Sequence, residues 1–395
     1  MTTSASTAAT QELGVGIVGF GWMGQVHTRA FTRLLQHYPN APLSPRLVAV
    51  ADPDEGRRDL AMAAYGFLDA VADWRDLVVR DDVHVVSVCG PNFVHRDVVV
   101  AAARAGKHVW VEKPAGRDLA DTLEIAEAVK LAGVSSAVGF NYRNAPAVEL
   151  AREIVATGEL GQVETVTISL LSDYAAHPDG ALSWRFDPVL AGTGALGDLA
   201  CHGLDLGRYV AGAATGEITD VVADQATFIV SRPEANGAVS HFATAPGGKF
   251  GPVGNEDQVS ALLRYASGAR GLMLASRVAV GEQCSYGFEV RGARGAVAWD
   301  FRRMGELRVC SGQDYQDATW RVQLVNASDG AYAVFQPGAG IAMGYDDLKV
   351  VEAERLVRSI AEKRPHGATI DDVVVTARLI DAMSRSFAER RWISL

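Results

Sequence analysis

Gly19-Phe20-Gly21-Trp22-Met23-Gly24 is the stretch that decides the fold of this chain. An apolar run, Leu13 to Phe20, leads into this glycine turn, and a helical pattern follows it through about Arg33. A second apolar run, Leu47 to Ala51, ends at Asp52. The order of strand, glycine turn, helix, strand and acid is typical of the first unit of a doubly wound α/β domain.

The rest of the first half keeps the same alternation. Apolar runs predict further buried strands at 83–89, 108–111 and 136–139, separated by helices at 96–105 and 119–132. Alternating strands and helices predict a parallel sheet covered on both faces, as in a Rossmann domain. We assign residues 13–140 to this domain, with residues 1–12, rich in Thr, Ser and Ala, as a flexible tail before it.

The glycine turn predicts a dinucleotide site. Its first glycine permits a tight turn, its second lets the backbone approach a pyrophosphate, and its third lets the helix pack on the strand. Asp52 can accept hydrogen bonds from a ribose diol and would repel a 2′-phosphate, which favours NAD over NADP. Arg57 and Arg58 leave NADP as the less favoured alternative, because either could reach such a phosphate. The residues predicted to bind the cofactor are Gly19, Phe20, Gly21, Trp22, Met23, Gly24, Asp52, Pro91, Asn92, His95, Glu112 and Lys113.

Two later segments follow strand ends. Pro91 and Asn92 end the strand at 83–89 and can present polar groups to a nicotinamide ribose, although an ordinary turn and helix cap would also explain them. Glu112-Lys113-Pro114 follows the strand at 108–111, at the carboxyl edge where open α/β sheets bind cofactor and substrate. A lysine at this edge predicts that the nucleotide-binding domain belongs to an enzyme.

The second half, residues 141–395, has a different pattern. Its strands are longer and follow one another across turn-sized gaps, which predicts a large, mainly antiparallel sheet. Helices predicted at 189–211, 345–361 and 371–390 can cover one face of that sheet, and the uncovered face is a predicted oligomer interface. The predicted strands are 163–171, 221–230, 258–265, 271–280, 287–291 and 295–301.

One segment of the second half carries chemistry. Asp198, His202 and Asp205 are spaced four and three residues apart, so in a helix they share one face. A neutral imidazole beside a carboxylate can take a hydroxyl proton near neutral pH. The alternative is a helix cap at Asp198 with a core histidine. No metal site is predicted, because no second histidine or cysteine stands near His202 at the spacing of zinc ligands.

Composition narrows the class of protein. The 395 residues are 48% hydrophobic, enough for two cores, and the net charge of −10 is spread along the chain, which argues against nucleic acid as a partner. Four scattered cysteines suggest neither a disulfide framework nor a zinc site, and fit a reducing cytoplasm. No apolar run is long enough to predict a membrane span.

Five motifs together resemble one family. The chain from Gly14 onward is similar to the glucose-fructose oxidoreductase and inositol dehydrogenase family, called Gfo/Idh/MocA. Ala200 stands where the family pattern usually has glycine, which predicts a slight shift of the helix start. The motifs, in the family's order and roughly its spacing, are Gly19-x-Gly21-x-x-Gly24, Asp52, Pro91-Asn92-x-x-His95, Glu112-Lys113-Pro114 and Asp198-x-x-x-His202.

The resemblance implies a fold and a site. The fold is an N-terminal Rossmann domain plus a C-terminal α/β domain with an open sheet, commonly paired into dimers or tetramers through that sheet. Lys113, Asp198 and His202 would converge on the substrate beside the nicotinamide. Residues 141–148 and 182–186 are most similar to members that oxidise levoglucosan and related sugars or cyclitols.

The sequence therefore predicts an NAD(P)-dependent enzyme that oxidises a secondary ring hydroxyl of a sugar, anhydrosugar or cyclitol to the ketone. His202 is the expected base, with Lys113 as the alternative. Two other functions stay open, a redox-assisted glycosidase with tightly bound NAD and a non-catalytic nucleotide-sensing regulator. Polyols need hydrogen bonds and a flat apolar face, although aromatic residues can also be ordinary core. The predicted substrate-binding residues are Tyr142, Arg143, Tyr174, Trp184, Asp198 and His202.

Overall fold

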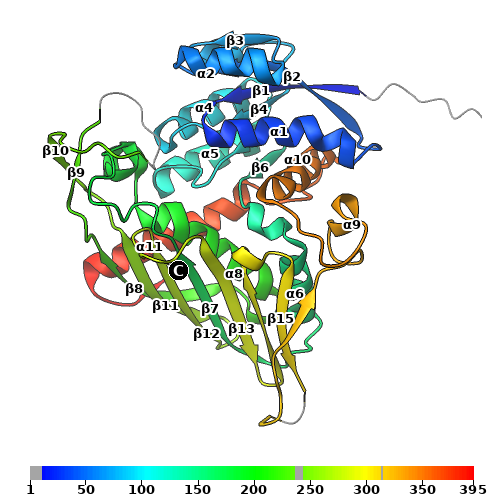
Figure 1. The fold of residues 1–395 in the computed structure, drawn as a ribbon, viewed down its shortest axis with the longest axis vertical. Helices are drawn as coiled ribbons and strands as arrows, with labels where there is room; N and C mark the ends of the chain where they lie inside the picture. Colours follow the sequence, from blue (N-terminus) through cyan, green and yellow to red (C-terminus); the bar gives the residue numbers. More distant parts are fainter. Residues whose placement is uncertain (1–10, 236–242, 313–314) are drawn as a thin grey trace, which may run out of the picture.

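The N-terminal half forms one parallel sheet at one end of the molecule (Figure 1). The computed structural model describes residues 11–235, 243–312 and 315–395. The strand order β3-β2-β1-β4-β5-β6 reverses between β1 and β4, where doubly wound sheets bind nucleotides. The predicted Rossmann sheet is confirmed. Its strands are β1 (Gln11–Val18), β2 (Leu43–Ala51), β3 (Asp69–Val71), β4 (Val85–Val88), β5 (His108–Val111) and β6 (Ser136–Val138).

Helices cover this sheet on both faces. α1 (Trp22–His37) follows the glycine turn and buries one side, including Val26, Phe31 and Leu34. Each such buried side chain stabilises the fold by roughly 1.5–3 kcal/mol relative to exposure. The other helices are α2 (Glu55–Leu60), which continues into the π-helix η1 (Ala61–Tyr65), α3 (Trp74–Val78), α4 (Asn92–Arg104) and α5 (Leu119–Ala132).

The first strand begins earlier than the sequence pattern indicated. Gln11 and Glu12 belong to β1, because they pair in parallel with Leu43 and Ser44 of β2. The sheet, and not the tail, therefore begins at Gln11. The rest of the predicted tail, residues 1–10, lies outside the described residues.

The second half contains a nine-stranded sheet in the order β16-β15-β14-β13-β7-β12-β11-β8-β17. Its neighbours are antiparallel except for β7 and β12, which run parallel, so the predicted mainly antiparallel sheet is confirmed. A separate hairpin pairs β9 (Ser231–Pro233) with β10 (Phe250–Pro252). The nine strands are β7 (Val163–Leu171), β8 (Ile218–Ala226), β11 (Gln258–Tyr265), β12 (Arg270–Ser276), β13 (Ser285–Gly292), β14 (Gly295–Asp300), β15 (Glu306–Ser311), β16 (Arg321–Leu324) and β17 (Ile393–Ser394).

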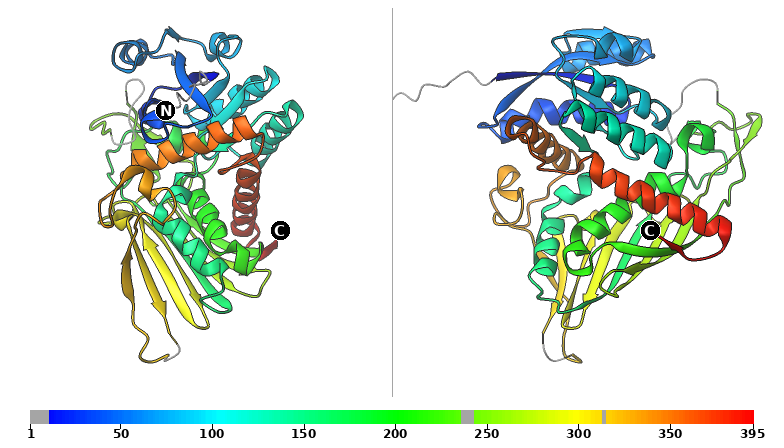
Figure 2. Two further views of the ribbon diagram at one scale, coloured as in Figure 1. Left: turned by 90° about the vertical axis from the view of Figure 1, so that its right-hand side faces the viewer. Right: turned by 180° about the vertical axis from the view of Figure 1, so that it is seen from behind.

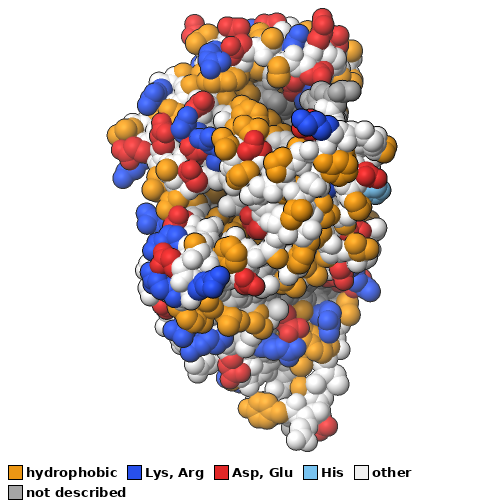
Figure 3. Space-filling model, turned by 90° about the vertical axis from the view of Figure 1, so that its left-hand side faces the viewer, with side chains coloured by type: hydrophobic (Ala, Val, Ile, Leu, Met, Phe, Trp, Pro, Cys, Tyr) orange, Lys and Arg blue, Asp and Glu red, His pale blue; other side chains and the backbone are white. Residues whose placement is uncertain are grey.

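Helices cover one face of this sheet and leave the other bare (Figure 2). On the bare face, Leu262 of β11 lies opposite Leu272 of β12, and the two side chains are 47% and 46% exposed. Elsewhere on the surface, acidic and basic side chains lie interspersed (Figure 3). The covering helices are α6 (Pro146–Ala156), α8 (Cys201–Thr215) and α11 (Ile370–Glu389).

The predicted helix at 189–211 is broken into three pieces. It consists of α7 (Pro188–Ala191), the π-helix η4 (Leu196–Ala200) and α8. Gly192 lies between α7 and η4 with a φ of +83°, and a Cβ there would overlap the carbonyl oxygen of Arg117. The break thus brings the second half into contact with the Rossmann domain. Shorter turns are η2 (Asn141–Asn144), η3 (Trp184–Phe186), η5 (Phe301–Arg303) and α9 (Tyr332–Phe335).

The last long helices bind the two sheets together. α10 (Tyr345–Glu362) lies against α1 and not over the second sheet (Figures 1 and 2). Its apolar side is buried, because Val350, Ala353 and Val357 pack in the Rossmann core. The expectation that this helix covers the C-terminal sheet was wrong, since a 3.6-residue period shows which side is buried but not against what. None of the helices in the described ranges is long and apolar enough to span a membrane.

Candidate active site

The glycine turn between β1 and α1 fits a pyrophosphate. Gly19 has a φ of +87°, and a Cβ on Gly24 would overlap the carbonyl oxygen of Gly19. A Cβ on Gly21 would meet nothing within 4 Å, so the backbone there is open to a ligand. α1 begins without a side-chain cap, which leaves its first N–H groups available to phosphate oxygens.

Asp52 holds the turn from the end of β2. Its Oδ2 accepts a hydrogen bond from Phe20 N at 2.7 Å, and its Oδ1 accepts one from Asp54 N at 2.9 Å. Arg57 lies 3.5 Å from the same carboxylate, and Arg58 donates to the Asp52 carbonyl oxygen at 2.8 Å. The turn and the acid therefore form one unit, in which a buried carboxylate would repel a 2′-phosphate.

A cavity of about 660 Å³ lies beside this turn, between the two halves of the chain. Most of the predicted site residues line it. Gly19, Phe20, Gly21, Gly24 and Asp52 belong to the turn behind it, and Pro91 caps α4. The predicted residues at its wall are Trp22, Met23, Asn92, His95, Glu112, Lys113, Tyr142, Tyr174, Trp184, Asp198 and His202.

Lys113, Asp198 and Tyr174 form a hydrogen-bonded group across the domain boundary. Lys113 Nζ donates to the Asp198 carbonyl oxygen at 2.6 Å and to its Oδ1 at 3.1 Å. Tyr174 Oη donates to Asp198 Oδ2 at 2.5 Å. Burial alone would raise the pKa of Asp198, but the Lys113 ammonium holds it well below the usual range. Burial alone would lower the pKa of Lys113, and the Asp198 carboxylate raises it, so the pair is ionised at neutral pH.

His202 lies on the same wall of the cavity, and its imidazole is neutral. Burial, followed by the Lys113 charge, holds the pKa of its imidazole well below the usual value. Its ring is 4.7 Å from the Tyr142 ring and, within the described residues, makes no hydrogen bond. The Asp198 carboxylate bonds Lys113, and within the described residues no hydrogen bond joins it to the imidazole.

A buried acid fixes the turn that carries Asp198. Glu256 Oε1 accepts hydrogen bonds from Gly194 N and Leu196 N, both at 2.8 Å. A Cβ on Gly194 would overlap the Glu256 carbonyl oxygen. The π-helix η4 follows, a form that often marks functional sites, and it contains Ala200 in place of the family's glycine, fully buried.

Arg143 and Asp205 do not join this site. Arg143 Nε donates to Asp205 Oδ2 at 2.7 Å, and Arg143 Nη2 bonds Asp372 at 3.0 Å. Burial raises the pKa of Asp205 to about 6 against the opposing charge of Arg143. Arg143 lines a different cavity, so it does not lie where the sequence led us to expect a substrate-binding residue. Asp205 lies in α8 with His202, but it pairs with Arg143 and is not among the described residues that line the cavity.

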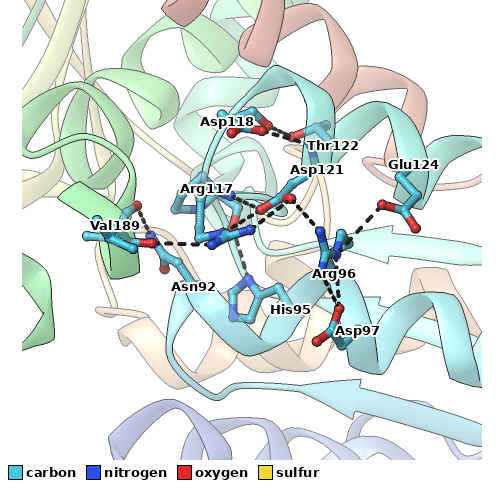
Figure 4. Close-up of polar contacts among 12 residues, drawn as sticks. Asn92, His95, Arg96, Asp97, Arg117, Asp118, Asp121, Thr122, Glu124 and Val189 are labelled. Atoms are coloured by element: carbon cyan, nitrogen blue, oxygen red, sulfur yellow. Dashed lines mark hydrogen bonds and ion pairs between the residues drawn. The ribbon is translucent and has the colours of Figure 1, made fainter. Parts of the chain in front are cut away.

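Asn92 and His95 support the cavity wall through backbone oxygens. Asn92 Nδ2 donates to Ala191 O at 2.9 Å, and the His95 ring lies 3.0 Å from Pro114 O and 2.8 Å from Gly90 O. Figure 4 shows Asn92 and Arg117 directed at the segment around Val189, whose carbonyl oxygen Arg117 reaches at 3.3 Å. These contacts hold α7 against the Rossmann domain.

Several residues of the wall were not predicted. Arg185 could have been found, because it lies within the stretch 182–186 that the resemblance singles out. Its guanidinium stacks over the neighbouring Trp184 ring at 4.4 Å. Arg277, paired with Asp257 at 2.9 Å, and Tyr286 lie near strand ends without a motif. Tyr345 comes from α10 and stacks on Trp22 at 5.3 Å between ring centroids. No three metal-ligating side chains meet closely enough to hold an ion in the described part of the chain.

The fold and this cavity define a two-domain oxidoreductase with a nucleotide-binding Rossmann domain. The chain belongs to the Gfo/Idh/MocA family: residues 13–140 match "Oxidoreductase family, NAD-binding Rossmann fold" and residues 148–298 match "GFO/IDH/MocA C-terminal domain". The predicted family, the NAD-binding domain and the enzyme class are thereby confirmed.

Individual relatives extend over nearly the whole chain. Levoglucosan dehydrogenase of Pseudarthrobacter phenanthrenivorans is 33% identical over 390 residues, covering 98% of each chain. Inositol 2-dehydrogenase of Rhizobium meliloti is 29% identical and covers 88% of this chain and 97% of its own. A solved structure of levoglucosan dehydrogenase with NADH and levoglucosan superimposes with a TM-score of 0.90 at 31% identity, covering 97% and 99% of the two chains.

Proposed function

We propose that the protein is an NAD-dependent dehydrogenase that oxidises a secondary ring hydroxyl of a sugar, anhydrosugar or cyclitol to the ketone. One observation carries this proposal. A cationic Lys113 and a neutral His202 line the same cavity, beside a glycine turn with an open backbone. The relatives named above act on levoglucosan and inositol, which supports a polyol as the substrate.

The chain's own residues would handle the proton. His202 takes the hydroxyl proton, because its imidazole is neutral and its nitrogens are not engaged by the described residues. Lys113 donates a hydrogen bond to the same oxygen and stabilises the developing alkoxide, while Asp198 and Tyr174 hold the lysine in place. The raised pKa of Lys113 argues against the lysine as base. When bound, NAD supplies the hydride acceptor.

Substrate recognition would use the aromatic part of the wall. Trp184 and Tyr142 offer flat apolar faces to a sugar ring. Arg185 offers donors that no acidic side chain within the described residues occupies at ion-pair distance. A ring with several hydroxyls can use both kinds of contact at once, so the wall suits a polyol better than an aliphatic alcohol.

The test is a substrate panel. Levoglucosan, myo-inositol and common aldoses are each incubated with NAD and with NADP, and the absorbance of the reduced cofactor is followed. We expect reduction of NAD with at least one anhydrosugar or cyclitol, and loss of turnover with retained NADH binding in Lys113→Ala and His202→Ala. Normal turnover in both variants would refute the mechanism. Cleavage of a glycoside without net NADH would favour the redox-assisted glycosidase.

The bare face of the second sheet supports an oligomer. We propose that copies of the chain pair through β11 and β12, where Leu262 and Leu272 are about half exposed. Sedimentation should show a dimer or tetramer, and the double variant Leu262→Glu with Leu272→Glu should sediment as a smaller species. The four cysteines are unpaired, in keeping with the cytoplasmic location that we propose.

A further inference from the structure

A second buried polar cluster lies behind the catalytic lysine. It consists of His27, Ser87, Glu112, Lys349 and Glu352, here called the rear cluster. Lys349 Nζ donates to Glu112 Oε1 at 2.5 Å, and His27 Nε2 lies 2.9 Å from the same oxygen. Lys349 and His27 are both 0% exposed. The cluster joins α1, β4, the end of β5 and α10.

Charges in this cluster are nearly balanced. Burial lowers the pKa of His27 to about 4, so its neutral ring donates to Glu112 and accepts from Ser87 Oγ, which is 2.8 Å away. Glu352 accepts from Trp110 Nε1 at 2.5 Å, but its Oε2 has no hydrogen-bond partner among the described residues. Burial raises the pKa of Glu352 to about 7. Of the two carboxyl groups, Glu112 is therefore the one whose negative charge Lys349 neutralises.

The geometry leaves Glu112 little freedom. A Cβ on Gly139 would overlap the Glu112 carboxyl group, so β6 closes one side while Lys349 and His27 hold another. Glu112 immediately precedes Lys113, whose ammonium reaches Asp198. A displaced Glu112 would therefore displace the backbone that carries Lys113. α10, which supplies Lys349, is itself fixed to α1 by Arg29–Asp346 and Arg33–Asp347 ion pairs.

We propose that Lys349 is a positioning residue for catalysis, which holds Glu112 and through it keeps Lys113 aimed at the substrate cavity. The inference rests on the proposed function, in which Lys113 binds the reacting hydroxyl. It assigns a role to a lysine that lies outside every motif of the sequence. α10 thus supports a site whose reacting groups lie on other elements.

Lys349→Met tests this role, because it removes the ammonium and keeps most of the volume. We expect kcat to fall about 10–100-fold, since a misplacement of about 1 Å can cost that much, while KM and the NADH Kd change less than about threefold. The matched control is Arg355→Met, which breaks an ion pair between α10 and Glu149 away from the cavity and should leave kcat unchanged. Unchanged kcat in Lys349→Met, or equal losses in both variants, would overturn the proposal.

A second readout needs no substrate. The rate at which trinitrobenzenesulfonate modifies Lys113 is measured against pH by peptide mass spectrometry. In the double variant Glu112→Gln with Lys349→Met the net charge behind Lys113 is unchanged, so a Lys113 displaced from Asp198, whose carboxylate raises its pKa, should show a lower midpoint than in the wild type. The other charged and titratable groups that face Lys113 and the rear cluster are His27, Cys89, His95, Asp198, Cys201, His202, Tyr345 and Glu352, and none of them is altered in the variant.

The two readouts separate this inference from the proposed function. Absence of NADH formation by the wild-type protein across the substrate panel would refute the proposed function, whereas an unmoved modification midpoint in the double variant Glu112→Gln with Lys349→Met would refute the positioning role alone. If Lys349→Met does not fold, the double variant Glu112→Gln with Lys349→Met replaces it, because it leaves no unpaired charge. That variant should show the same loss of kcat, and normal kcat in it would overturn the proposal.

Discussion

The two lysine clusters on either side of residues 112 and 113 differ in the exposure of the lysine and in hydrogen bonding. The front cluster, Lys113, Asp198, Tyr174 and His202, borders the cavity, and the Lys113 side chain is 12% exposed. The rear cluster holds Lys349 at 0% exposure. Both pair an ammonium with a carboxylate in a buried setting. Only the front cluster has a group, the His202 ring, that makes no hydrogen bond within the described residues, so the same ion-pair chemistry can serve reaction in one place and rigidity in the other.

The largest expected effect concerns His202. We expect His202→Asn to lower kcat about a thousandfold, because a positioned general base contributes roughly 10²–10⁴-fold, with NADH binding unchanged by fluorescence titration. His366→Asn is the matched control, since that histidine pairs with Glu362 at 2.8 Å away from the cavity. Near-normal kcat in His202→Asn would remove the distinction between the clusters.

Tyr174→Phe should have a smaller effect. The substitution removes the hydroxyl that donates to Asp198 Oδ2, and a hydrogen bond to a charged group is worth about 1.5–3 kcal/mol. We expect kcat/KM to fall about 10–150-fold, since each 1.36 kcal/mol corresponds to a factor of ten. Tyr332→Phe also removes a buried hydroxyl, one bonded to the carbonyl oxygens of Gly338 and Ile341, and should lower stability without changing kcat/KM. Equal kinetic losses in the two variants would contradict the assignment of Tyr174.

The pH profile of kcat/KM should show a smaller effect, which tests the environment of the His202 imidazole. In the proposed mechanism His202 acts in its neutral form, and burial together with the Lys113 charge lowers its pKa well below the usual value. The neutral form therefore persists as pH falls through about 6.5, the ordinary value for histidine. We expect kcat/KM at pH 6 to stay above half of its plateau. An acid limb with its midpoint at or above 6.5 would show that the imidazole is not in the environment described.

Spacing within the sequence was enough to find the front cluster but not the rear one. Gly19 to Gly24, Lys113, Asp198 and His202 each stand in a short motif at a strand or helix end, where local pattern carries the information. His27, Glu112 and Lys349 come together from positions 85 and 237 residues apart. No local pattern predicts such contacts. The helical period of α10 indicates which of its sides is buried, but not which element packs against that side.

Arg143 and Asp205 show the same limit at shorter range. Arg143 follows Tyr142, which does line the cavity, yet the tight turn η2 directs the arginine to Asp205 and Asp372. Adjacent residues in a 3₁₀ turn point to different sides, and the sequence did not specify that turn. Asp205 keeps its helical spacing from His202 within α8, but its side chain pairs with this arginine and does not line the cavity. The direction of the Arg143 side chain thus depends on a 3₁₀ turn that residue propensities do not predict.

The last prediction concerns Glu352 of the rear cluster, where we expect an effect on the free energy of unfolding and not on the kinetics. Its pKa is raised from the usual 4.5 to about 7 in the folded protein, so the folded state binds the proton more tightly than the unfolded chain. The stability that this proton contributes is complete below pH 4.5 and is lost as pH rises through about 7. The loss amounts to at most about 3 kcal/mol, since 2.5 pKa units correspond to 1.36 kcal/mol each.

Glu352→Gln should remove that loss, because the amide stays neutral at every pH. Urea denaturation at pH 5 and pH 8 measures it: the free energy of unfolding should decline less between these values in the variant than in the wild type. Glu389→Gln, at the exposed end of α11, should decline in parallel with the wild type. If Glu352→Gln declines in parallel too, Glu352 is already ionised at pH 5. The rear cluster would then carry a net negative charge behind Lys113, and would hold that lysine electrostatically as well as by position.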